Sequence, residues 1–124
     1  MVNQQTVADR ATRPTPEELA AYRENLLEQR LFRQEQLRQI AASATSRADA
    51  LIEQRSPAQV EVRVKLAASA RMVLADVEAA LRRMDEGTYG DCHLCRRPVE
   101  RERLAIVPQA RYCARCQQVR EAGR

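Results

Sequence analysis

The sequence contains few of the residues that build a thick globular core. Among its 124 residues there is no Trp, only one Phe and three Tyr, and only three Gly. Aromatic side chains supply much of the buried volume of most cores, so this shortage argues against a large compact core. The chain also has a single His and no glycine-rich phosphate loop, so we expect a non-enzymatic protein.

Long apolar stretches are missing as well. No run approaches the roughly 18 apolar residues of a membrane span, and the first residues lack the apolar stretch of roughly 7 to 15 residues found in a signal peptide. We therefore expect a cytoplasmic protein. In that compartment thiols stay reduced, and clustered cysteines more often bind a metal than form disulfides.

Ala, Leu, Arg, Glu and Gln dominate the composition, which is typical of long helices and coiled coils. Residues 1–14 are polar and aperiodic and are predicted to be disordered. Thr15 and Glu18 then form a capping box, and Pro16 suits the first helical position. No Gly or Pro follows before residue 55, so a first helix is predicted up to about that point.

A second helix start follows directly. Ser56 can cap a helix, Pro57 suits its first position, and Gln59 completes a second capping box. The helix is predicted to run to Glu86 and to stop at Gly87, because glycine is the preferred residue just after a helix end.

Both predicted helices carry an apolar seam. The second alternates steps of four and three residues, as in a coiled-coil heptad, at positions Leu66, Ala70, Val73, Val77, Ala80 and Met84. The first has a similar seam, interrupted by arginines, at Leu26, Leu37, Ile40, Ala44 and Leu51. The simplest fold is an antiparallel hairpin over residues 15–86 with its tip near 53–57. The heptads alone equally allow a homodimer or a helical assembly protein.

All four cysteines lie in one window with the spacing C-x₂-C-x₁₇-C-x₂-C, formed by Cys92, Cys95, Cys113 and Cys116. Two CxxC pairs at such a distance are typical of a four-thiolate structural zinc site. The 17 intervening residues leave room for a short hairpin. We expect one structural Zn²⁺ to replace the core that residues 87–124 cannot build alone.

Other uses of these cysteines are less well supported. An iron–sulfur cluster could use four thiolates, but paired knuckles favour zinc. A thioredoxin-like redox pair needs a strand followed by a helix, and disulfides need an oxidising compartment. His93 follows Cys92 directly, and because four cysteines already complete the tetrahedron, we interpret it as a surface residue.

The C-terminal module is basic. Residues 87–124 hold eight Arg against four acidic residues, although four thiolates and one Zn²⁺ would add a charge of −2. A nucleic-acid-binding finger is therefore an alternative function, with phosphate contacts from Arg96, Arg97, Arg101, Arg103, Arg111 and Arg115. Against it, the module has only two aromatic residues on which bases could stack.

The pattern around the cysteines resembles the C4 zinc finger of the DksA/TraR family. That family reads approximately G-x-[YF]-G-x-C-x₂-C-G-x₂-I-x₃-R-L-x-A-x-P-x-A-x₂-C-x₂-C. Besides the cysteines, the matching residues are Gly87, Tyr89, Gly90, Val99, Arg103, Leu104, Pro108 and Ala110. Arg96 stands where a Gly is usual, and Ile106 where an Ala is usual. The order of a polar N-terminus, a helical hairpin, a finger and a short helix from about Ala114 is also similar to the family's.

The resemblance implies a regulator of bacterial transcription that binds RNA polymerase core or holoenzyme through the secondary channel without reading a DNA sequence. It also implies guanosine tetraphosphate as a ligand, because several members respond to it. Acidic residues at the hairpin tip act near the active site of the polymerase in this family. Here Asp49 lies near the first of two usual Asp positions, Ile52 lies near the second, and Glu53 is the nearest acidic substitute. A monomer is expected rather than a dimer, and no membrane partner.

Overall fold

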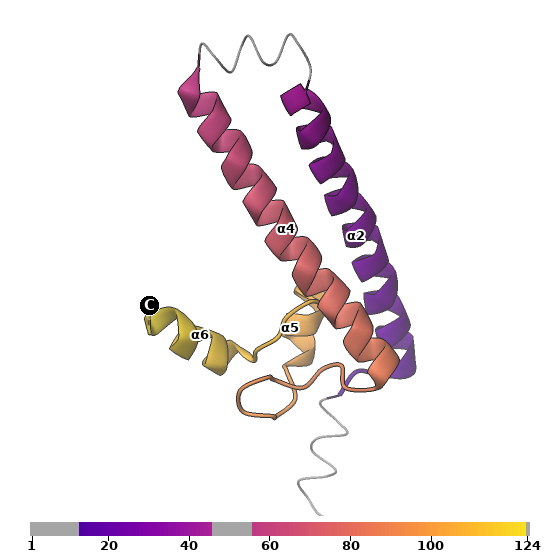
Figure 1. Cartoon of the computed structure of the whole chain (residues 1–124). Coiled ribbons are helices and arrows are strands. Elements are labelled where there is room, and N and C mark those ends of the chain that lie inside the picture. The colour runs from indigo at the N-terminus through magenta and orange to yellow at the C-terminus, as the bar shows by residue number, and fades with distance from the viewer. Residues whose placement is uncertain (1–12, 46–55, 124) are drawn as a thin grey trace, which may run out of the picture. The chain divides into compact units, whose positions relative to one another are not determined.

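The structure is a computed structural model that describes residues 13–45 and 56–123. Its elements, in chain order, are helix α2 (Pro16–Thr45), helix α4 (Pro57–Glu86), helix α5 (Arg101–Ile106) and helix α6 (Ala114–Ala122). The two long helices lie side by side and antiparallel, followed by a small module that contains the four cysteines (Figure 1). The predicted helical hairpin with a cysteine module and a short C-terminal helix is therefore confirmed.

The predicted helix starts are confirmed where the structure describes them. The backbone N–H of Glu18 donates to the Thr15 hydroxyl (3.1 Å), and the Thr15 N–H donates to the Glu18 carboxylate (3.0 Å). This reciprocal pair is the capping box that the sequence predicts. Helix α4 begins at Pro57 and ends at Glu86, and Gly87 follows with φ of 78°, the left-handed conformation that glycine adopts without strain. The predicted disordered segment 1–14 lies largely outside the described residues, as does the hairpin tip.

The chain packs as two compact units. One comprises Met1–Leu27 and Asp76–Arg124, and the other comprises Glu28–Ala75. We call them the finger unit and the outer hairpin unit. The helices α2 and α4 each contribute a segment to both. The sequence-based division of the chain at residue 87 stays a prediction.

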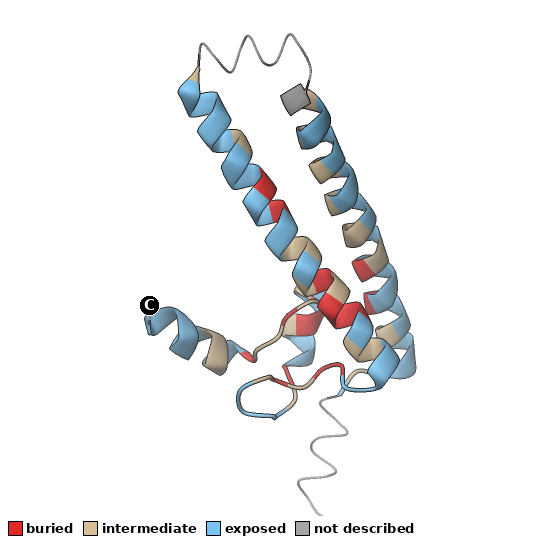
Figure 2. Ribbon diagram, in the orientation of Figure 1, coloured by how far each residue is buried: buried red, intermediate tan, exposed pale blue. Residues whose placement is uncertain are grey.

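The finger unit holds the large buried side chains (Figure 2). They come from α2, from the end of α4, from α5 and from the segments between the cysteines, and they include Leu26, Val77, Val99, Leu104 and Pro108. Polar contacts join the same elements. The Tyr89 hydroxyl donates to the Pro108 carbonyl (2.7 Å), and the Arg101 guanidinium at the start of α5 donates to Glu18 at the start of α2 (2.7 Å).

The outer hairpin unit is packed differently. Among its described residues only Ala67 and Ala70 are buried. Leu66, predicted in the seam, is 49% exposed, whereas Ala70, Val77 and Ala80 are fully buried as predicted. Ile40 and Leu37 are half-buried, and the predicted seam positions Ala44 and Leu51 lie outside the described side chains.

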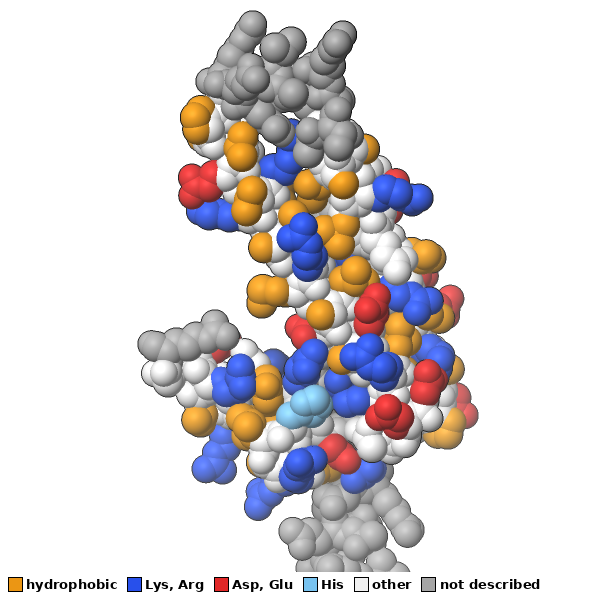
Figure 3. All heavy atoms as spheres, in the orientation of Figure 1, with side chains coloured by type: hydrophobic (Ala, Val, Ile, Leu, Met, Phe, Trp, Pro, Cys, Tyr) orange, Lys and Arg blue, Asp and Glu red, His pale blue; other side chains and the backbone are white. Residues whose placement is uncertain are grey.

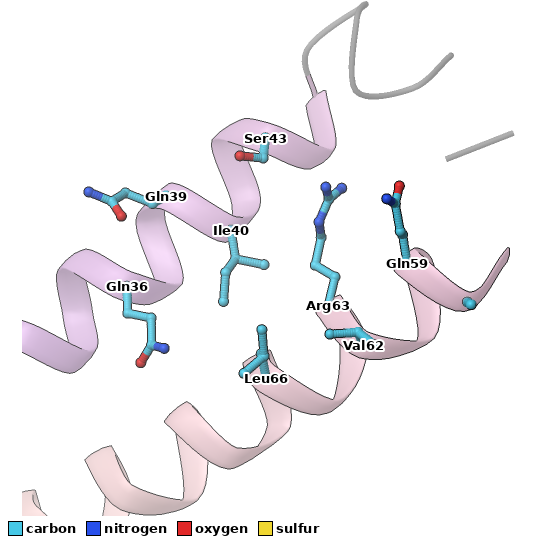
Figure 4. A pocket seen from close by; sticks show the side chains of 9 residues that line it. Gln36, Gln39, Ile40, Ser43, Gln59, Val62, Arg63 and Leu66 are labelled. Atoms are coloured by element: carbon cyan, nitrogen blue, oxygen red, sulfur yellow. The ribbon is translucent and has the colours of Figure 1, made fainter. Parts of the chain in front are cut away.

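An open groove of about 690 Å³ lies between α2 and α4 in the outer hairpin unit. Figure 4 shows Ile40 of α2 and Val62 and Leu66 of α4 pointing toward one another across it. Amide side chains and Arg63 form its walls. No helix of the described chain is both long enough and apolar enough to cross a membrane.

Candidate metal centre

The first cysteine pair lies on a tight turn that follows α4. Gly90 (φ 97°) reverses the chain, and the carbonyl of Gly90 accepts from the N–H of Val99 (2.8 Å). Asp91 and Pro98 then form an isolated antiparallel bridge. Inside this bridge the N–H of Cys92 donates to the carbonyl of Arg97 (2.8 Å), and the N–H of Arg96 donates to the carbonyl of Cys92 (3.0 Å). The turn therefore brings Cys92 and Cys95 to one side of a closed loop.

The second cysteine pair lies at the start of α6. Cys113 is the N-cap residue, and its Sγ accepts a hydrogen bond from the N–H of Cys116 (3.4 Å). The residue three positions after an N-cap lies in the first helical turn, so its side chain lies close to the capping side chain. The CxxC spacing thus directs the thiols of Cys113 and Cys116 to the same point.

Helix α5 joins the two cysteine pairs, where the sequence left room for a short hairpin. The helix places Leu104 in the core with no exposed surface. Arg103 at the same helix donates from Nε to the Tyr112 carbonyl (2.9 Å), just before the second cysteine pair. Leu104 thus attaches the segment between the cysteine pairs to the core. The isolated bridge of Asp91 with Pro98 is the sole β pairing in the described chain.

The ligand atoms of the four cysteines form one cluster. Their Sγ atoms all lie within 4.8 Å of one another, and those of Cys95 and Cys113 are 3.9 Å apart. A disulfide would bring two sulfurs to about 2.05 Å, whereas four sulfurs at about 2.3 Å from a tetrahedral zinc ion lie about 3.8 Å apart. The cysteines are free in the structure. The cluster fits one structural zinc ion.

Backbone N–H groups favour the ionised, metal-binding form of one thiol in the cluster. Burial of Cys92 opposes ionisation, but hydrogen bonds from the backbone of Cys95, Cys113 and Leu94 outweigh it and lower the pKa of the Cys92 thiol to about 6. The pKa of Cys116 is raised to about 12, first through its hydrogen bond with Cys113, because neighbouring thiols resist a further negative charge. Zn²⁺, by binding all four sulfurs, would supply the charge that allows every thiol to ionise.

The surroundings of the cluster are rich in arginine. Arg111 donates from Nε to Asp76 of α4 (2.9 Å), and Arg101 and Arg103 are engaged as described above. Half of the arginines that were candidates for phosphate contacts thus bind partners within the chain. The remaining three, Arg96, Arg97 and Arg115, are exposed.

His93 lies half-buried beside this arginine group. Burial lowers the pKa of its imidazole, and the charges of Arg83, Arg111 and Arg96 lower it further. Its ring also meets the Tyr112 ring edge-on, with centroids 6.0 Å apart. Figure 3 shows Lys and Arg side chains gathered around the histidine. The sequence analysis interpreted His93 as a surface residue; it is half-buried here, and the four clustered ligand atoms come from the cysteines.

Sequence reasoning missed Arg83, which lies at the end of α4 and faces this group. Burial lowers the pKa of its guanidinium, and the nearby charges of Arg111 and Arg82 act in the same direction. Nothing in a helical heptad pattern singles out such a residue, because its neighbours come from distant segments. The predicted tip residues Asp49 and Glu53 lie outside the described residues.

Known proteins resemble this chain in its cysteine-containing segment and in its fold. Residues 87–122 match the model of the prokaryotic DksA/TraR C4-type zinc finger. An uncharacterised protein of Aquifex aeolicus (strain VF5) is 38% identical over 52 residues, which cover 40% of this chain and 36% of the relative. The chain therefore matches only about a third of that relative's length.

The fold is similar to that of transcription factor DksA2 from Pseudomonas aeruginosa. The TM-score is 0.70 at 21% identity, and the match covers 97% of both chains. This likeness concerns the fold, while the finger model adds the cysteine pattern and its surroundings. Residues 87–122 thus match the DksA/TraR C4-type zinc finger, and the chain has a DksA-like fold.

Proposed function

We propose that this protein is a non-enzymatic regulator of bacterial transcription that binds RNA polymerase with its helical hairpin. The observation that carries the proposal is the match of nearly the whole chain to the fold of a transcription factor, together with a finger of the same family. The hairpin enters the secondary channel of the polymerase. The protein acts as a monomer in the cytoplasm.

Zinc has a structural role in this proposal. Cys92, Cys95, Cys113 and Cys116 are its ligands, and because four protein ligands complete the tetrahedron, no position remains for a reactive water. The metal holds the cysteine segments and α6 in place. The arginines Arg101, Arg103 and Arg111 then join the module to α2, to its own backbone and to α4.

The exposed apolar surface of the outer hairpin unit supports a binding role. Val62, Val64 and Met72 are each more than half exposed, as are Leu31 and Phe32 on α2. Exposed apolar side chains that form a contiguous patch typically mark a contact surface. A protein that binds by its hairpin would cover these side chains in the complex.

The test is a binding measurement with the zinc-loaded chain and RNA polymerase core at moderate salt. A known secondary-channel factor serves as the competitor. The proposal predicts saturable binding that the competitor displaces. Binding that the competitor leaves unchanged would place the contact elsewhere on the polymerase, and no binding by the folded, zinc-loaded chain would refute the proposal.

The tip determines the output rather than the affinity. Replacing Asp49 and Glu53 by Ala should leave polymerase affinity within about twofold, because most side chains of a large interface contribute little to its affinity, while any effect on transcription is lost. Adding guanosine tetraphosphate to the same transcription assay tests the nucleotide as a ligand. An unchanged transcriptional effect of the double variant would show that the tip acidic residues are not used.

A further inference from the structure

A cavity of about 410 Å³ lies beside the zinc finger, at the end of α4. Three nitrogen-bearing side chains line it: Arg83 of α4, and His93 and Arg96 of the first cysteine turn. The Thr88 hydroxyl lines it as well. Donor groups from two separate segments thus converge on one space, all within the finger unit.

Arg83 has unused hydrogen-bonding capacity there. Its Nε atom is buried and has no hydrogen-bond partner among the described residues. A buried donor without a partner costs free energy, and a guanidinium is built to bind an oxyanion through two parallel N–H groups. The Nε–H group of Arg83 could therefore donate to an acceptor bound in this cavity.

Arg96 occupies its position at a conformational cost. Its φ is 65°, and Arg96 is the only residue other than glycine with a positive φ in the described chain. A side chain with a Cβ is disfavoured in this left-handed region, where glycine is not. Strained residues of this kind often serve a site, and the strain here brings a second guanidinium to the rim of the cavity that Arg83 lines.

The acidic groups nearby are partly occupied. Arg111 engages Asp76 (2.9 Å), and Arg13 pairs with Asp91 (3.3 Å). Glu86, Asp91 and Cys92 also line the cavity; Glu86 is exposed, and Asp91 Oδ1 is buried and has no hydrogen-bond partner. The two guanidinium groups of Arg83 and Arg96 thus face the cavity together with two carboxylates, one of which is paired with Arg13 outside the cavity lining.

We propose that this cavity, between Arg83, His93 and Arg96, binds a phosphate group. Phosphate matches the site because its oxygens accept from both guanidinium groups, from the histidine N–H and from the Thr88 hydroxyl. The volume is larger than one phosphate needs, so the group belongs to a larger molecule, either a small phosphorylated compound or a nucleic-acid backbone. The inference does not depend on polymerase binding.

The test uses the full, zinc-loaded chain and inorganic phosphate as the probe. Phosphate is titrated at constant ionic strength, and the backbone amide resonances around residues 93 and 96 are followed by NMR. Saturable shifts at these residues are expected. Arg96→Gln should weaken binding about tenfold, the effect of losing one charge-assisted hydrogen bond. Arg97→Gln is the matched control, because it removes the same charge from the neighbouring residue, which does not line the cavity.

A second variant uses the backbone strain. Arg96→Gly should raise the melting temperature and weaken phosphate binding at the same time, because it relieves the left-handed φ and removes the guanidinium. If Arg96 had no role in binding, Arg96→Gly would raise the melting temperature and leave phosphate binding unchanged. Equal losses in the Arg96→Gln and Arg97→Gln variants, or shifts that do not saturate, would overturn the proposal.

Two further measurements identify the source of the phosphate and exclude a simpler role. If a single-stranded oligonucleotide binds more tightly than free phosphate and competes with it, the phosphate belongs to a nucleic acid; otherwise it belongs to a small molecule. The simpler role is balancing the negative charge of the zinc-bound thiolates. In that case Arg96→Gln would weaken zinc affinity in a chelator competition and leave the phosphate response intact, which would refute the site.

Discussion

The finger unit buries large side chains such as Leu26 and Leu104, whereas the described part of the outer hairpin unit buries only Ala67 and Ala70. Burial of apolar surface stabilises a fold in proportion to its area, so an alanine core contributes much less than a leucine core. The finger unit also has ion pairs between elements far apart in the chain. In the described part of the outer unit, ion pairs such as that of Lys65 with Glu61 (3.1 Å) join residues one helical turn apart.

This difference indicates where the stability of the chain is concentrated. Helix propensity and pairs within one helix sustain the outer hairpin unit, and such contributions are small in water. Regions with few buried apolar contacts open locally at a lower free energy than the core. The outer hairpin unit thus keeps many apolar side chains exposed, whereas the finger unit has its own core and the cysteine cluster.

Loss of zinc should have the largest effect on this comparison. Replacing Cys113 by Ser removes one ligand and the N-cap sulfur of α6, so we expect loss of bound zinc and unfolding of residues 87–122. Zinc content and the amide NMR spectrum measure both. A variant with unchanged zinc content and an unchanged spectrum would contradict the structural role of the metal.

Truncating one leucine in each unit should show the second largest effect. Leu26→Ala leaves a cavity in the finger unit and should lower the free energy of unfolding by about 3 kcal/mol. Leu66→Ala in the outer unit should cost less than about 1 kcal/mol, because Leu66 is half exposed. Chemical denaturation of both variants gives the two values. Equal losses would mean that the two units do not differ in packing energy.

The cap at Thr15 and the predicted cap at Ser56 offer a smaller test. Thr15→Ala removes the hydroxyl that accepts from the Glu18 N–H and should lower stability by about 1 kcal/mol. Ser56 precedes α4 within the outer hairpin unit, so for Ser56→Ala we expect faster amide exchange in the first turns of α4 with little change in global stability. Hydrogen exchange resolved by residue distinguishes the two results. If the Ser56 variant instead lowers the stability of the whole chain, the two units unfold together.

The smallest expected effect depends on pH. A backbone hydrogen bond from Thr15 and the Arg101 guanidinium lower the pKa of Glu18 from 4.5 to about 2. A lowered pKa means that the ionised form stabilises the folded state, so this contribution is complete above pH 4.5 and is lost as the pH falls toward 2. Glu18→Gln should therefore be less stable than the parent at pH 7, and the difference should shrink across that interval.

Glu17→Gln is the control for this measurement, because it removes the same charge from the same helical turn. Melting curves recorded between pH 2 and pH 7 test the prediction. A difference between the parent and Glu18→Gln that stays constant with pH would show that the Arg101 contact does not stabilise the fold.

Local signals in the sequence were reliable predictors. The capping box of Thr15 and Glu18, the start of α4 at Pro57 and its end before Gly87 depend on residues within one or two turns of each other. The two CxxC pairs are also local, because each places two thiols on one short turn or helix start. Such features need no knowledge of the rest of the chain.

Contacts between distant segments could not be predicted in this way. The heptad count placed Leu66 and Ala70 in one seam, yet only Ala70 is buried, since burial depends on how closely the partner helix approaches. Helix α5 lies between the cysteine pairs and buries Leu104 in the core. The spacing of the cysteines contains no information on which residue between them is buried.

The sequence by itself determined the helical hairpin, the cysteine module and their order, because capping, periodicity and ligand spacing act over a few residues. Only the tertiary structure decided which side chains gather around the module. Arg101 meets Glu18, Arg111 meets Asp76, and Arg83 and Arg96 share a cavity because helices and turns far apart in the chain pack together. Their charges interact through space over a few ångströms, and that distance is fixed by packing rather than by position in the sequence.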